Sequence, residues 1–198
     1  MCKKRVALMT GLVLAFSGIA AQGETSGLLG EYYTGVNWYE AYDTGEPVLA
    51  RIDPVIDFTW GSLGPDPSLI DGVMFAVRWR GEIEIPYSGT YTFTISSNDG
   101  ARLYVDNALL VDDWGPPHGA RDGSGTIDLH PGLYPIMIEH LQTGGTAELH
   151  FYWQHELISR QIIPADALLP FVIHGPKATN PSPDDESTDV LRDVILGW

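Results

Sequence analysis

The feature that most constrains this chain is a regular alternation of apolar and polar side chains over residues 88–115. The first run places an aromatic or aliphatic residue at every second position: Tyr91, Phe93 and Ile95. A period of two is typical of a β-strand with one buried face. The pattern returns over residues 101–105 and 109–111, so we expect three consecutive short strands.

The turn between the first two of these strands carries Asn98, Asp99 and Gly100. Asn and Asp side chains bond to nearby backbone groups in tight turns, and Gly adopts backbone geometries that other residues resist. Clustered oxygen atoms on a tight loop are also what a Ca²⁺ ion needs. From these residues alone, both an ordinary turn and a calcium-binding loop are open.

The short-strand pattern recurs through most of the chain. Apolar residues alternate with polar ones over residues 75–85, 134–138 and 147–153, and Gly and Pro punctuate the sequence between these runs. There is no convincing amphipathic helix longer than two turns. Regular short strands separated by turn residues predict an all-β fold, an antiparallel β-sandwich or barrel.

The N-terminus has the composition of a secretory signal peptide, which we place at residues 1–23. Three basic residues precede an apolar run over residues 6–16, and small residues follow it. The apolar run is shorter than the about 20 residues of a spanning helix, so an integral membrane protein is not predicted. Cys2 is the only cysteine, and its removal with the signal would leave no disulfide in the exported chain.

The charge balance argues against two kinds of partner. Removing three of the 11 basic residues with the signal leaves eight against 26 acidic residues, a net charge of −18. Such a surface repels nucleic acid and anionic membranes, because phosphate binding needs clustered Lys and Arg. The prediction is a secreted or cell-surface protein with no nucleic-acid partner.

Composition divides the exported chain into a folded domain and a tail. Residues 24–170 hold the strand patterns and have the length of one domain. Residues 171–189 are rich in Pro, acidic and hydroxyl side chains, which cannot bury enough apolar surface to fold alone, and we expect a linker there. Apolar character returns over residues 190–198, which we interpret as the first strand of a following domain in a longer modular protein.

Further motifs accompany residues 88–115 in a fixed order. They are GLLGEYY (27–33), RIDP (51–54), DFTW (57–60), VRWRG (77–81), LHPGLY (129–134) and IPADAL (163–168). Together they resemble the PA-fourteen (protective-antigen-type) domain family, which is found in flocculins, adhesins and some glycosidases. The resemblance covers about residues 27–170 and implies a β-sandwich of barrel-like form.

The resemblance implies a Ca²⁺-dependent sugar site at Asn98 and Asp99. In carbohydrate-binding members, two successive acidic residues at these positions are joined by a cis peptide bond and both ligate Ca²⁺. The ion then ligates hydroxyl groups of a terminal sugar. This chain departs from the pattern by having Asn98 where the family often has Asp, so one formal charge is lost and a lower metal affinity is expected.

A second loop, residues 141–146, completes the site that the resemblance implies. Gln142 matches a side-chain ligand, and the main-chain carbonyls of Gly144 and Thr146 match further ligands. The alternative is a Gly-rich hairpin turn without a ligand. Trp38 belongs to an aromatic cluster that could stack on a sugar ring, although covering the core is the commoner role of such residues. The metal ligands expected are Asn98, Asp99, Gln142, Gly144 and Thr146, and the sugar contacts expected are Asn98, Asp99, Gln142 and Trp38.

Catalysis finds little support in the sequence. There is no G-x-S-x-G or H-E-x-x-H motif. Glu82 and Glu84 share one face of a predicted strand, whereas a glycosidase pair needs a sugar-sized cleft between its carboxyl groups. His140 and His150 fall on opposite-running strands and would make at most a weak zinc site, with solvated histidines as the alternative. We interpret Asp112 as structural.

The sequence therefore predicts a secreted, non-catalytic, lectin-like module. It would bind glycans or cell-surface polysaccharide through Ca²⁺, act as a monomer and serve adhesion. Two alternatives stay open: a structural or protein-interaction module of a larger secreted protein with a degenerate site, and an accessory domain of a glycosidase.

Overall fold

The computed structural model describes residues 26–35 and 46–170 of the 198-residue chain. The predicted signal peptide (1–23), linker (171–189) and following strand (190–198), together with Trp38, lie outside the described residues. The described residues form strands and one 3₁₀ turn, Ala165–Ala167. This confirms the all-β prediction.

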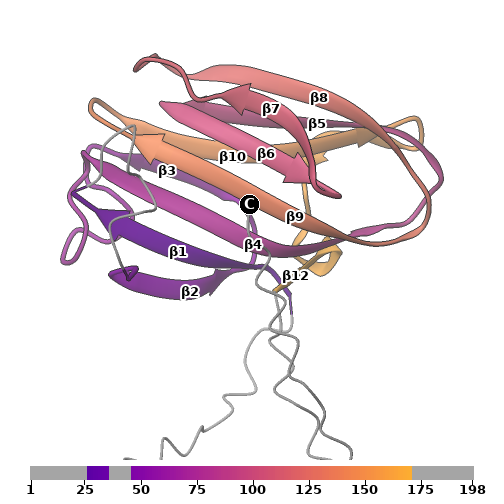
Figure 1. Cartoon of the computed structure of the whole chain (residues 1–198), viewed down its shortest axis with the longest axis horizontal. Coiled ribbons are helices and arrows are strands. Elements are labelled where there is room, and N and C mark those ends of the chain that lie inside the picture. The colour runs from indigo at the N-terminus through magenta and orange to yellow at the C-terminus, as the bar shows by residue number, and fades with distance from the viewer. Residues whose placement is uncertain (1–25, 36–45, 171–198) are drawn as a thin grey trace, which may run out of the picture.

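The strands form two antiparallel sheets that face each other as a sandwich (Figure 1). The larger sheet contains β1 (Leu28–Thr34), β2 (Leu49–Asp53), β4 (Phe75–Ile85), β6 (Gly100–Val105), β7 (Ala108–Asp113), β9 (Gly132–Gln142) and β12 (Leu168–Pro170). The smaller sheet contains β3 (Asp57–Gly61), β5 (Gly89–Asn98), β8 (Arg121–Leu129), β10 (Ala147–His155) and β11 (Ile158–Ile162). The strand orders are β2-β1-β4-β9-β6-β7, with β12 beside β4, and β11-β10-β5-β8, with β3 beside β10.

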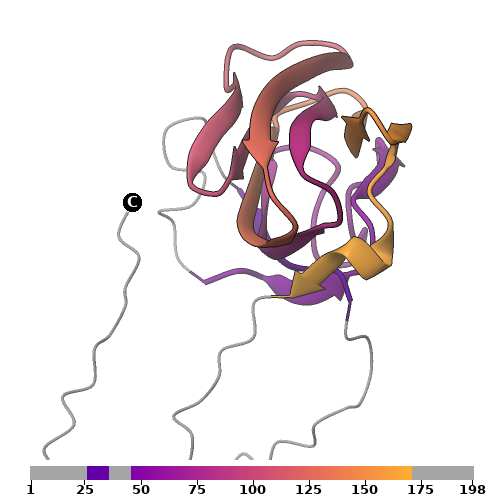
Figure 2. The same ribbon diagram turned by 90° about the vertical axis from the view of Figure 1, so that its right-hand side faces the viewer.

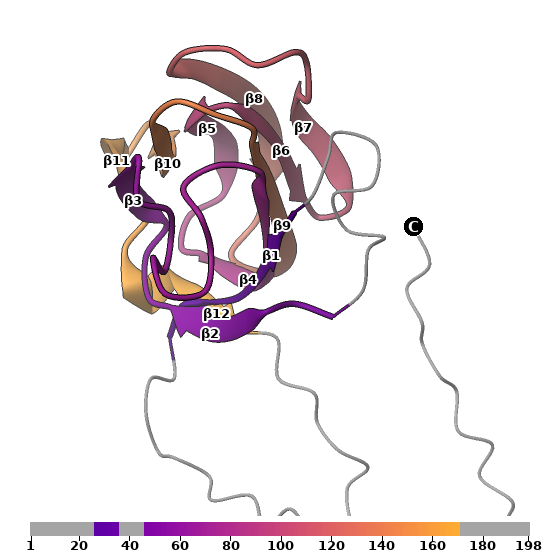
Figure 3. The same cartoon turned by 90° about the vertical axis from the view of Figure 1, so that its left-hand side faces the viewer.

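Views of the two ends show the sheets as curved layers around a common interior (Figures 2 and 3). Two glycines of β8 let it approach β7 closely. A Cβ atom on Gly125 would lie 2.4 Å from the carbonyl oxygen of Leu110, and one on Gly123 would lie 2.6 Å from Val111 Cγ1. No strand pairing joins β7 to β8 in the described part of the chain, so the sandwich is barrel-like in section without being a closed barrel.

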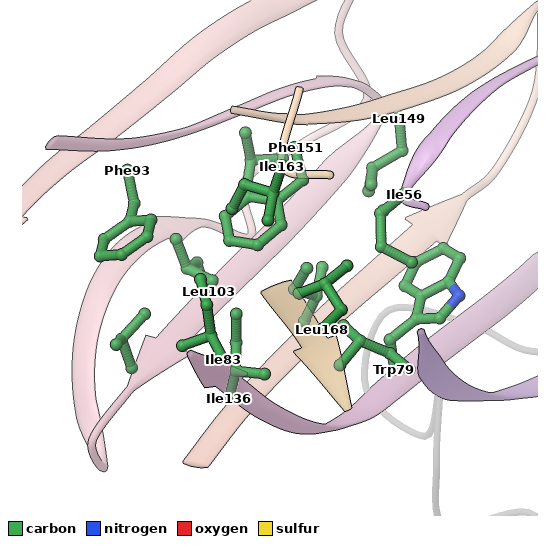
Figure 4. Close-up of a cluster of buried hydrophobic side chains, with 14 of the residues drawn as sticks. Ile56, Trp79, Ile83, Phe93, Leu103, Ile136, Leu149, Phe151, Ile163 and Leu168 are labelled. Atoms are coloured by element: carbon green, nitrogen blue, oxygen red, sulfur yellow. The ribbon is translucent and has the colours of Figure 1, made fainter. Parts of the chain in front are cut away.

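The alternating pattern of the sequence becomes the core of the sandwich. Tyr91, Phe93 and Ile95 of β5 are buried, as the period of two predicts. Figure 4 shows side chains from the two sheets meeting, with Phe93 on one side and Ile83 on the other. Full burial of such a side chain stabilises the fold by about 1.5–3 kcal/mol, so the many residues of this cluster supply the main driving force for folding.

One carboxylate lies within this apolar surrounding and is fully partnered. Asp53 is 3% exposed and accepts hydrogen bonds from Trp79 Nε1 (2.7 Å), Arg51 Nε (2.7 Å) and the Tyr32 hydroxyl. A buried charge is tolerated only when such donors surround it. Burial and the neighbouring Asp53 charge raise the pKa of Tyr32. A Cβ atom on Gly30 would lie 2.6 Å from Asp53 Oδ2, which explains the second glycine of the GLLGEYY motif.

Two connections carry the chain between the sheets at the same end of the sandwich. The Asp99 turn leads from β5 in the smaller sheet to β6 in the larger one, and residues 143–146 lead back from β9 to β10. The second connection is not the hairpin considered above, because β9 pairs with β4 and β6 whereas β10 pairs with β3, β5 and β11. Asn98 pairs with Glu148 and Gly100 pairs with Leu141, so the two connections lie side by side.

Candidate functional site

Four of the described connections meet at one end of the sandwich. Besides the Asp99 turn and residues 143–146, they are residues 62–74 between β3 and β4 and residues 114–120 between β7 and β8. Figure 3 looks onto this end. Pairing of Phe75 with Gln142 and of Gly61 with Ala147 holds residues 62–74 against the β9–β10 connection.

Asn98 forms the outer part of the site. The peptide bond between Asn98 and Asp99 is cis, as the family resemblance implies for this position. Asn98 is half-buried at the end of β5, and its Nδ2 lies 3.4 Å from the hydroxyl oxygen of the exposed Thr146. Asn98 and Thr146, predicted from two separate loops, are therefore neighbours at the rim.

The Asp99 carboxylate lies deeper and is held on both of its oxygens. Asp99 is 2% exposed. Its Oδ1 accepts the backbone N–H of His118 at 2.8 Å, and its Oδ2 accepts the backbone N–H of Thr143 at 3.0 Å and the Thr143 hydroxyl at 2.8 Å. Asp99 thereby joins three connections: its own turn, residues 114–120 and residues 143–146.

Gln142 brings an unpaired acceptor into the same region. Its side chain is fully buried, and Nε2 donates to the carbonyl oxygen of Gly144, with the carbonyl oxygen of Thr146 at 3.5 Å. The other amide atom, Oε1, is buried and receives no hydrogen bond from any described residue. A buried acceptor without a donor costs about 1–3 kcal/mol, so this amide oxygen could accept a partner that the described residues do not supply.

The donor atoms fit a hard cation. Asp99 offers a carboxylate, Asn98 and Gln142 offer amide oxygens, and Gly144 and Thr146 offer main-chain carbonyls. Such an all-oxygen set is what Ca²⁺ prefers, and a cation would satisfy the buried Oε1 of Gln142. Within residues 26–35 and 46–170, no three His, Cys, Asp or Glu side chains gather as a metal cluster. Neutral oxygens would therefore have to supply most of the coordination, and few charged ligands mean modest affinity.

His140 lies on β9, two residues before Gln142, and is fully buried. Its Nδ1 lies 3.1 Å from the carbonyl oxygen of Gly100, and its ring packs on Trp60 with 5.8 Å between centroids. Burial lowers the pKa of His140 to about 4, so its ring is neutral at pH 7. The idea of a solvated strand histidine is therefore wrong for His140.

His150 lies in the other sheet, so the two histidines considered as a zinc pair are not brought together. It is half-buried on β10, and its Nδ1 lies 2.6 Å from Asp57 Oδ1. Its partner is thus a carboxylate on the neighbouring strand β3.

The acidic pair at the end of β7 makes ion pairs on the surface. Asp112 accepts a hydrogen bond from Arg102 Nε at 2.8 Å, as expected for a structural residue. Asp113 binds Arg121, which lowers the pKa of the Asp113 carboxyl, and lies 3.3 Å from His118 Nε2. These pairs brace residues 114–120, the connection whose backbone reaches Asp99.

Sequence reasoning missed two residues of the site, Thr143 and His118. Thr143 stands between the predicted ligands Gln142 and Gly144, so its hydroxyl could have been noticed as a nearby donor. His118 contributes only its backbone N–H, which every residue except Pro carries, so no side-chain signal could reveal it. Trp38 lies outside the described residues and stays a prediction.

Comparison with known proteins agrees with this architecture. The family model described as PA14 domain matches residues 24–167. Anti-sigma-I factor RsgI3 from Acetivibrio thermocellus is 40% identical over 149 residues, which cover 75% of this chain and 22% of that protein. The solved structure of an anti-sigma factor domain-containing protein is 36% identical, with a TM-score of 0.68, and the match covers 78% of this chain and 51% of that chain.

A solved lectin-type domain has the same fold. The PA14 sugar-binding domain from an RTX adhesin is 20% identical, with a TM-score of 0.62, and the match covers 74% of this chain and 99% of that one. The anti-sigma relatives are longer, since this chain spans about a fifth of the curated protein and half of the solved one. In the described part of the chain, no helix has the length and apolar character to cross a membrane. With the fold, the motif order and a family match over most of its length, the chain belongs to the PA14 domain family.

Proposed function

We propose that this chain is a non-catalytic, lectin-like module that binds glycans through Ca²⁺. The observation that carries the proposal is the Gln142 amide, whose buried Oε1 has no donor among the described residues. The same amide lies against the carbonyl oxygens of Gly144 and Thr146. The amide nitrogen now faces those carbonyls, so a cation held by all three oxygens would require the amide to turn over and direct Oε1 toward the ion, which would also give Oε1 a partner.

Five residues would hold the ion, and these are Asn98, Asp99, Gln142, Gly144 and Thr146. When bound, Ca²⁺ supplies a positive centre that takes sugar hydroxyl oxygens as further ligands. Asn98 and Thr146 lie at the exposed rim, where a sugar would approach. Trp38 remains the proposed stacking residue for a sugar ring.

The comparisons support a binding role in a larger exported protein. The RTX adhesin domain is titled a sugar-binding domain, and the anti-sigma relatives are named for regulation rather than for catalysis. We place the module outside the cytoplasm, because residues 1–23 have the composition of a signal peptide. Its glycan partners would then be extracellular or on a cell surface.

A second candidate function is a structural or protein-interaction module whose ion site is degenerate. Asn98 in place of a carboxylate favours it, because affinity for Ca²⁺ rises with the number of charged ligands. The sequence identity with the longer anti-sigma proteins also favours this second function.

Calcium-dependent retention on a glycan array distinguishes the two functions. The wild-type chain should be retained on some glycans in Ca²⁺ and released by a chelator. Gln142→Leu, which removes the buried amide, should abolish retention. Gln154→Leu is the matched control, because Gln154 is exposed on the outer face of β10. The Ca²⁺ mechanism would be overturned if the chain were still retained in the presence of the chelator, or if Gln142→Leu were retained like the wild type.

A further inference from the structure

The two oxygens of the Asp99 carboxylate accept different numbers of hydrogen bonds. Oδ2 accepts two hydrogen bonds from Thr143, one from the backbone N–H at 3.0 Å and one from the hydroxyl at 2.8 Å. Oδ1 accepts one, from the backbone N–H of His118 at 2.8 Å. A carboxylate oxygen has about two lone-pair positions. Among the residues that the structure describes, Thr143 therefore fills Oδ2, and one position on Oδ1 is left open.

We propose that Thr143 is a positioning residue for the cation site, whose hydroxyl fixes the Asp99 carboxylate so that Oδ1 faces the ion. This inference rests on the proposed function. Asp99 is 2% exposed, so water cannot replace the hydroxyl freely. Turning the carboxylate about its own axis would break the hydrogen bonds from Thr143 and His118 together.

The sequence makes this orientation unusually important. Asp99 is the one carboxylate of the predicted ligand set, because Asn98 stands at the neighbouring acidic position of the family. Ligating carboxylates are commonly held by hydrogen bonds from outside the ligand set, and loss of such a partner weakens metal binding by about 10–100-fold. Thr143 is also the direct neighbour of Gln142, so one short segment supplies both a ligand and the group that orients another.

The test is a calorimetric Ca²⁺ titration of the full chain after metal removal. Thr143→Val keeps the size of the side chain and the backbone N–H that reaches Oδ2, and removes only the hydroxyl. We expect a dissociation constant for Ca²⁺ about 10–100-fold higher than that of the wild type. Thr143→Ser restores a hydroxyl at the same position and should recover affinity close to that of the wild type.

Thr90→Val is the matched control for the loss of a hydroxyl–carboxylate hydrogen bond. The Thr90 hydroxyl donates to Asp128 Oδ1, and Thr90 lies near the start of β5, at the other end of the sandwich. This variant should bind Ca²⁺ like the wild type. Thermal melting in chelator shows whether both Val variants are folded. If the Thr143 hydroxyl only stabilises the fold, Thr143→Val should lower this melting temperature and leave the affinity for Ca²⁺ unchanged.

The outcomes separate the two proposals. Wild-type binding with unchanged affinity in Thr143→Val would overturn the positioning role and leave the proposed function standing. Equal weakening in Thr143→Val and Thr143→Ser would also overturn it, because the hydroxyl would then not be the cause. A wild-type chain that takes up no Ca²⁺ would overturn the Ca²⁺ mechanism and this inference with it.

Discussion

Replacing Asp99 by Ala should weaken the fold even when no Ca²⁺ is present. The substitution removes the acceptor of three hydrogen bonds and leaves the backbone N–H groups of His118 and Thr143 without it. A hydrogen bond to a charged group contributes about 1.5–3 kcal/mol when its loss leaves a buried partner. Since these donors are only partly buried, water would replace part of what is lost, and we expect a loss of about 3 kcal/mol in all.

Thermal melting of the chelated chain measures this effect. For a chain of this size, 1 kcal/mol shifts the melting temperature by about 2–4 °C, so a decrease on the order of 10 °C is expected. Asp112→Ala is the control, because its side chain is 51% exposed and pairs with a partly exposed arginine. Such surface ion pairs contribute about 0–1 kcal/mol. Equal melting temperatures for Asp99→Ala and wild type in chelator would refute the bridging role of Asp99.

Three further predictions concern charge, pH and the tail. Asn98→Asp should tighten Ca²⁺ binding by about tenfold by adding a carboxylate, which calorimetry measures; an unchanged affinity would exclude Asn98 from the ligand set. The pKa of His140 in the folded chain, about 4, lies below the ordinary value of 6.5. Below pH 6.5 the unfolded chain therefore binds a proton that the folded chain does not, so the free energy of unfolding should decrease by about 3 kcal/mol as the pH decreases from 6.5 toward 4. Urea unfolding at pH 7 and 4.5 checks this, and His140→Gln should reduce the difference. Deleting residues 179–198 should leave the melting temperature nearly unchanged, and a decrease of many degrees would show that the tail packs on the domain.

Local pattern was sufficient to predict the strands and the turn at residues 98–100 between two of them. The period of two in residues 91–95 reports one buried face, and β5 buries those residues as predicted. The family resemblance, and not local pattern, placed Asn98 and Gln142 in one site. Their loops lie together through Thr146, and their role as ligands stays a prediction. The strand predictions share a cause, because each depends on residue types at short spacing.

The features that escaped prediction depend on contacts between distant segments. His140 continues the alternation of Ile136 and Ile138, whose side chains lie in the core, so the pattern does indicate an inward face. What it could not show is that Trp60 and Phe75 pack on the ring. Residues 143–146 cross from one sheet to the other because of which strands pair. A Gly-rich loop has the same composition in a hairpin, so the sequence could not distinguish the two connections. The backbone N–H of His118 reaches Asp99 across 19 positions of sequence, and nothing in the residue type indicates it.

A calorimetric titration of the wild-type chain with Ca²⁺ tests the central proposal most directly. The residues described here predict saturable binding of one ion per chain, with a dissociation constant in the range of about 10⁻⁴–10⁻³ M typical of extracellular modules. The same ion should raise the melting temperature, since a ligand that binds only the folded state stabilises it. No heat and no thermal shift at millimolar Ca²⁺ would contradict the proposal and favour a structural module with a degenerate site.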